Sequence, residues 1–212
     1  MFNFGVLAAA LPAAGGGTLT GAFLQGAGDS TDLTTYTYAS QNLGTASSDR
    51  VVVVAVSGRQ SSARTITSVT IGGVSATEIG TRGSSQNPLG IWMAAVPTGT
   101  TGDVVATFSG AMLRSTIILW AVTGGATLSG ASSGTDTATV TGVTGGFIIA
   151  AANTTGSGAT FTWTNATERY DAVQESSLAT SGADATTVGS TTITATPTIA
   201  STNGIVVVAL TP

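Results

Sequence analysis

The chain has 212 residues and a formal charge of −4, and only 8% of its side chains are charged. It contains no His, Cys or Lys, so all six cationic side chains are Arg. The missing residues are the usual proton shuttles, nucleophiles and metal ligands of enzymes that work near neutral pH. We therefore expect no enzymatic activity, no catalytic residue, no metal and no cofactor.

The charge balance and hydropathy exclude further classes of protein. The pI is about 4.4, and the arginines are scattered, whereas nucleic-acid binding needs a cationic stripe that neutralises phosphates. No window approaches the roughly 18 uninterrupted apolar residues of a membrane helix, so neither a nucleic-acid partner nor a membrane span is expected. A soluble monomer would carry about 25% charged residues. The neutral surface therefore predicts close packing against neighbours or an extracellular exposure.

The first 17 residues, MFNFGVLAAALPAAGGG, differ from the rest of the chain. They are apolar and uncharged, and they end in a Gly-rich joint. The segment is too short to build a core, so we expect an N-terminal arm that anchors the protein to a partner. The arm's contact residues would be Phe2, Phe4, Val6, Leu7 and Leu11. A local strand or plug of the same domain, and a secretion signal or membrane tether, remain alternatives. Residues 18–33 are expected to form a linker.

From residue 34 onward the sequence predicts β-strands. Residues 51–56 read VVVVAV, the pattern of a strand buried on both faces. Residues 66–71 alternate as ITSVTI and are followed by Gly72-Gly73 and a second short strand, which predicts a hairpin. Residues 111–121 have an ambiguous period, but their β-branched residues favour a strand. Further strands are expected at 89–96, 103–108, 116–122, 137–141, 147–152, 159–163, 167–173, 178–183, 191–196 and 204–210.

The short, regular spacing of these strands predicts one all-β domain over residues 34–212. We expect an antiparallel two-sheet β-sandwich, jelly-roll-like, with the N-terminal arm extended from it. No repeat of fixed length is visible, which disfavours a propeller or a β-helix. The three tryptophans and three of the six phenylalanines fall on predicted strands, where they are expected to be core residues.

Few side chains form a pattern that carries chemistry. Asp29 and Asp32 lack the remaining ligands of a calcium loop and are expected to lie in a solvated turn. On a regular strand over 167–173, Glu168 and Tyr170 would share one face and Arg169 and Asp171 the other. Nothing in this spacing establishes the carboxylate pair of a glycosidase.

Six segments of the chain resemble those of a known protein family. They are VVVVAVSG (51–58), TSVTIGGVSATEIG (67–80), GIWMAAVPTGTTGDVVATFSG (90–110), ILWAVTG (118–124), TWTNATERYD (162–171) and GIVVVAL (204–210). In style and strand order the chain resembles Gly/Thr/Ser-rich β-sandwich structural proteins of tailed bacteriophages and gene-transfer particles. Such modules serve as capsid decoration (cement) proteins, head fibres, spikes or tail parts. The resemblance brings no catalytic residues.

The resemblance implies a virion structural protein on the outer surface of the particle. The first hypothesis is a capsid decoration protein whose arm binds the major capsid protein or another virion protein. Self-association is expected, with a trimer as one form. The second is a head or tail fibre or spike domain that binds a host surface glycan, with Tyr36, Tyr38 and Tyr170 as the candidate contact residues. A secreted adhesin or surface-layer domain is a third.

Overall fold

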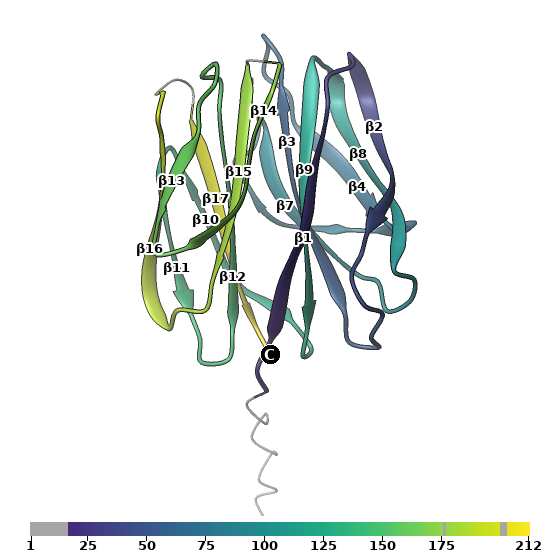
Figure 1. Ribbon diagram of the computed structural model, residues 1–212, viewed down its shortest axis with the longest axis vertical. Coiled ribbons are helices and arrows are strands. Elements are labelled where there is room, and N and C mark those ends of the chain that lie inside the picture. Colours follow the sequence, from purple (N-terminus) through teal and green to yellow (C-terminus); the bar gives the residue numbers. More distant parts are fainter. Residues whose placement is uncertain (1–16, 176, 200–202) are drawn as a thin grey trace, which may run out of the picture.

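The computed structural model describes residues 17–175, 177–199 and 203–212. These residues form antiparallel β-strands and, within the described ranges, no helix. The strands make four sheets that stack as four layers (Figure 1). The expectation of an all-β, sandwich-like protein is therefore confirmed, although the chain has four sheets where two were predicted. A jelly-roll connectivity stays a prediction.

The first half of the chain forms two of the layers. Its inner sheet has the order β1 (Thr20–Asp29), β9 (Arg114–Thr123), β3 (Val51–Arg59), β7 (Leu89–Ala95) and β6 (Thr77–Thr81). Its outer sheet has the order β2 (Leu33–Asn42), β8 (Thr101–Met112), β4 (Ile66–Ile71) and β5 (Val74–Ser75). The predicted Gly-Gly hairpin is the connection between β4 and β5, where Gly72 and Gly73 both have positive φ.

The second half forms the other two layers. Its inner sheet has the order β10 (Thr127–Gly134), β17 (Gly204–Thr211), β12 (Phe147–Thr154), β15 (Leu178–Ala185) and β14 (Thr167–Gln174). Its outer sheet has the order β11 (Thr137–Gly142), β16 (Gly189–Pro197) and β13 (Phe161–Thr164). The two inner sheets face each other in the middle of the stack (Figure 1).

The same strand order occurs in both halves. Apart from the two-residue strand β5, each strand of the first half has a counterpart in the second, from β1 and β10 at the start to β9 and β17 at the end. The first counterparts begin at Thr20 and Thr127, and the last begin at Arg114 and Gly204. The second half is thus shorter than the first. Because the connecting loops differ in length between the two halves, the repeat has no fixed period. This explains why no period is visible in the sequence.

Three apolar cores separate the four layers. One lies within each half, between its outer and inner sheet, and the third lies between the two inner sheets. The central strands β3, β12 and β17 of the inner sheets bury both faces, and for that reason they read as continuous apolar runs. The outer strands bury one face only and alternate, as in the TATVTG of β11.

Glycines let the two inner sheets approach each other closely. A Cβ built on Gly182 of β15 would lie 2.9 Å from Trp120 Cη2 of β9. On β1, the rings of Phe147 and Tyr170 occupy the space above Gly21 and Gly26. Glycine in a strand interior commonly marks such a close approach. The two halves therefore interdigitate at these positions.

Residues 20–29 form strand β1, where the sequence predicted a linker. The strand pairs with β9 and completes the first inner sheet, and its apolar residues Phe23 and Leu24 pack against the cores. Its glycines Gly21 and Gly26 serve for packing, because rings of the second half lie over them. The expected arm contacts Phe2, Phe4, Val6, Leu7 and Leu11 lie outside the described residues.

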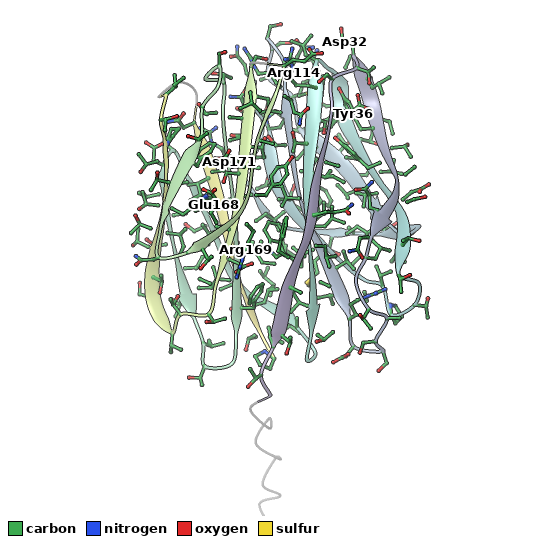
Figure 2. The ribbon with its side chains drawn as sticks, viewed as in Figure 1. Asp32, Tyr36, Arg114, Glu168, Arg169 and Asp171 are labelled. Atoms are coloured by element: carbon green, nitrogen blue, oxygen red, sulfur yellow. The ribbon has the colours of Figure 1, made fainter. Side chains whose placement is uncertain are left out.

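The described chain begins and ends at the same end of the stack. The Pro212 side chain lies 3.6 Å from a Cβ built on Gly17, and Leu19 N–H donates to the carbonyl of Gly145. We call this the proximal end. β1 runs from there to Asp29, which pairs with Ser115 at the opposite, distal end. Asp32 and Arg114 lie at the distal end (Figure 2).

Candidate functional site

Two of the three candidate glycan contacts are buried, which corrects the sequence-based expectation. Tyr36 is 0% exposed and Tyr38 is 6% exposed. Both alternate on β2 with exposed threonines and face the core of the first half. The Tyr36 hydroxyl lies 2.7 and 2.8 Å from the carbonyl oxygens of Thr31 and Met112, which share its one proton. These side chains tie the edge strand β2 to its sheet and present no aromatic surface to a sugar.

Tyr170, the third candidate, is half-buried between the inner sheets. Its ring covers Gly26 of β1, so one ring face is occupied by backbone. Burial raises the pKa of Tyr170, and the nearby Asp171 carboxylate raises it further. Its main role is to join the second inner sheet to β1.

Because the tyrosines are buried, their hydroxyls should ionise at a higher pH in the folded protein than in the unfolded chain. Burial raises the pKa of Tyr36 to about 12 and also raises the pKa of Tyr38. An unfolded tyrosine ionises near pH 10. Because the folded pKa is the higher one, the free energy of unfolding should be unaffected by these groups below about pH 10 and should fall as pH rises from about 10 to 12. Ultraviolet absorbance should show tyrosinate at lower pH in denaturant than in buffer, and coincident titration curves would contradict the burial.

A β-bulge changes the faces expected for residues 168–171. The register of β14 against β15 shifts between Glu168 and Tyr170, so Arg169 is the extra residue. Arg169 and Tyr170 consequently both lie toward the first half, whereas the regular alternation predicted opposite faces. Glu168 and Asp171, which pair with Ala183 and Ser181, both lie toward the second outer sheet. Figure 2 labels the three charged residues of this segment.

The two carboxyls of β14 are in different environments. Asp171 Oδ2 accepts a hydrogen bond from the backbone N–H of Phe161 at 2.8 Å, which ties β13 to β14. Burial raises the pKa of Asp171, and it also raises the pKa of Glu168, with repulsion from Asp171 as the second cause. The Glu168 side chain is exposed at the edge strand. The hydrogen bond assigns Asp171 a structural role.

The strongest polar constellation joins Arg169, Asp184 and Trp120. Arg169 Nε donates to both carboxylate oxygens of Asp184 at 3.0 Å, and its Nη2 donates to Oδ1 at 2.9 Å. Trp120 Nε1 of the first half donates to Asp184 Oδ2 at 3.1 Å. The side chain of Asp184 is 5% exposed and that of Arg169 is 43% exposed. The carboxylate thus joins the two halves and fixes the guanidinium at the surface.

A pocket of about 530 Å³ lies over this ion pair. Its polar wall includes Asn165 and Thr167, which precede and begin β14, and Thr186 and Thr187, which follow β15. Phe147 and Gly21 form the remainder of the wall toward β1. The spacing of Arg169 from Asp184 along the chain gave no signal for this site, because the two residues meet only through the pairing of β14 with β15.

The outer faces of the stack are neutral hydroxyl surfaces. No charged residue occurs in strands β11, β13 and β16, and Asp103 is the one charged residue in β2, β4, β5 and β8. Threonines pair across the strands: Thr139 and Thr192 at 2.8 Å, and Thr35 and Thr107 at 3.2 Å. The exposed hydroxyl residues of the second outer sheet are Thr137, Thr139, Thr141, Thr162, Thr164, Ser190, Thr192 and Thr196.

A buried arginine braces the proximal end. Arg50 is 1% exposed and bonds four backbone carbonyls and no carboxylate. The acceptors, all at 2.7–2.9 Å, are Gly44, Val96, Thr98 and Gly99. Nearby, the Asp49 carboxylate accepts from the Gly124 N–H at 2.7 Å. These contacts hold together the turns beside Gly17 and Thr18, the first described residues of the chain.

No family model, curated protein or solved structure matches the chain. Within the described ranges, no helix is long and apolar enough to cross a membrane. In the same part of the chain, no three acidic side chains gather where they could hold a metal ion.

Proposed function

We propose that the protein is a non-enzymatic structural component of a virion, a capsid decoration protein that attaches through its N-terminal arm. The proposal combines the resemblance of the sequence with the arrangement of the molecule. The stack would stand with its proximal end on the shell and its distal end outward. The arm would bind the major capsid protein or another virion protein.

The position of the chain ends is the observation that carries this proposal. Gly17 lies at the proximal end beside Pro212, so the apolar residues 1–16 join the stack at one pole. Attachment through this segment would leave both outer faces and the distal end accessible. The braced turns around Arg50 and Asp49 would give the attachment point a rigid base.

The neutral outer faces support lateral packing between copies. Threonine hydroxyls exchange hydrogen bonds with water for hydrogen bonds with a neighbour, at a far smaller desolvation cost than charged side chains. Neutral faces also exert no long-range repulsion between identical copies. Homo-oligomerisation, with a trimer as one form, is part of the proposal.

A fibre or spike domain that binds a host glycan is the second candidate. The pocket over Arg169 favours it, because a fixed guanidinium, an amide and threonine hydroxyls are groups that can bond sugar hydroxyls. The pocket takes the place of the buried Tyr36 and Tyr38 in this alternative.

Copy number distinguishes the two candidates. We expect quantitative mass spectrometry of purified particles to find many copies, in a fixed ratio to the major capsid protein. A decoration protein repeats with the symmetry of the shell, which gives such a ratio. A few copies per particle would favour the fibre, and absence of the protein from purified particles would contradict both.

A further inference from the structure

An apolar groove of about 540 Å³ opens near the proximal end, between the edge strand β6, strand β7 and strand β10. Val51 and Met93 line it and pack against the core between the inner sheets, so the groove continues that core to the surface. Leu128 of β10 is 42% exposed at its rim, and Val74 is 40% exposed. Isolated exposed apolar side chains are ordinary, but a groove that connects them to a core needs a cover.

The chain itself supplies a segment of matching chemistry. Residues 1–16 contain no charged side chain, and Asn3 is their one polar side chain. The bulky apolar residues are confined to the first eleven positions, and Pro12, two alanines and two glycines follow as a short tether. A segment of this composition has few polar groups to desolvate, so its transfer out of water costs little free energy. Burial of its phenylalanine and leucine side chains is favourable.

The segment begins close to the groove. Gly17 lies against Pro212, Thr211 pairs with Thr127, and Leu210 pairs with Leu128. Neighbouring strands lie about 4.8 Å apart, so the rim is a few strand widths away. Sixteen residues can span up to roughly 50 Å when extended. Such a short tether gives the segment a high effective concentration at the groove of its own molecule.

We propose that residues 1–11 cover this groove of their own chain in the free protein. Their apolar side chains extend the core between the inner sheets and remain shielded until a partner competes for them. This contact within the free protein is independent of any attachment to a particle. If both hold, the segment leaves the groove when the protein docks on a shell.

Engineered cysteines test the proposal, because the natural chain has none. The test variant carries Leu7→Cys and Leu128→Cys. The matched control carries Leu7→Cys and Leu33→Cys, since Leu33 is the same residue type with nearly the same exposure, 40% against 42%, and lies at the distal end. Under mild oxidation at low protein concentration, we expect the intramolecular disulfide to form about tenfold faster or more in the test variant. Equal rates in the two variants would overturn the proposal, and so would a disulfide-linked dimer as the main product.

Proteolysis provides a readout without cysteines. Chymotrypsin cleaves after the phenylalanines and leucines of residues 1–11. Cleavage there should be several-fold faster in a Leu128→Asp variant than in the natural protein, whereas Leu33→Asp should leave its rate unchanged. Folding of both variants is checked by their circular dichroism. Cleavage of the folded Leu128→Asp variant at the natural rate would show that the groove does not hold the segment.

Discussion

Replacing Gly182 by Val should lower the free energy of unfolding by about 3 kcal/mol, because overpacking a closely packed core costs this much. The Cβ of the new side chain would lie 2.9 Å from Trp120 Cη2 and 3.0 Å from Ile118 Cδ1. Both neighbours are 0% exposed and packed on all sides. The added methyl groups can be accommodated only if the inner sheets separate. Urea unfolding followed by tryptophan fluorescence measures the change.

Gly130→Val is the matched control for this substitution. Gly130 is also a strand glycine without positive φ, and a Cβ built on it meets no atom within 4 Å. Its replacement should change the free energy of unfolding by less than about 0.5 kcal/mol, as is usual for surface positions. If both variants were equally stable, the close contact of the two halves at Gly182 would be wrong.

Much of the local structure could be predicted from the sequence. The VVVVAV run of β3 and the alternating ITSVTI of β4 have periods that identify buried and half-buried strands. The Gly72-Gly73 turn follows from its need for positive φ. These features depend on residues close together in the chain, where the pattern contains the necessary information.

The layering was harder to predict, because it depends on how distant segments pair. A continuous apolar run shows that a strand is buried on both faces, but it does not identify the sheets on either side. Strand β1 contains three glycines, and Thr20 is its one β-branched residue, so its composition is typical of a linker. Its strand character comes from β9 on one side and from the rings of Phe147 and Tyr170 above it.

The candidate sites also depend on contacts between distant segments, which local sequence patterns do not show. Tyr36 and Tyr38 alternate with threonine on β2, a pattern that is equally typical of a core face and an exposed aromatic face. The structure places them in the core. The ion pair of Arg169 with Asp184 depends on a bulge and on strand pairing, neither of which leaves a short-range signal in the sequence.

Deletion of residues 1–16 should abolish attachment to the particle and leave the stack folded. The described strands pair with one another and enclose three apolar cores, which should suffice to hold the stack together. The deletion removes every side chain that the proposal assigns to the shell contact, so we expect a loss of binding beyond the detection limit. The circular dichroism of the truncated protein should remain close to that of the full chain, and the truncated protein should still unfold cooperatively.

The most direct measurement is therefore co-sedimentation of full-length and truncated protein with shells that lack the protein. Leu33→Asp serves as the control, since it changes an exposed apolar residue at the distal end and leaves the arm intact. The account predicts that the full-length protein and this control pellet with the shells, while the folded truncated protein stays in the supernatant. Equal binding of the truncated protein would contradict attachment through the N-terminal arm.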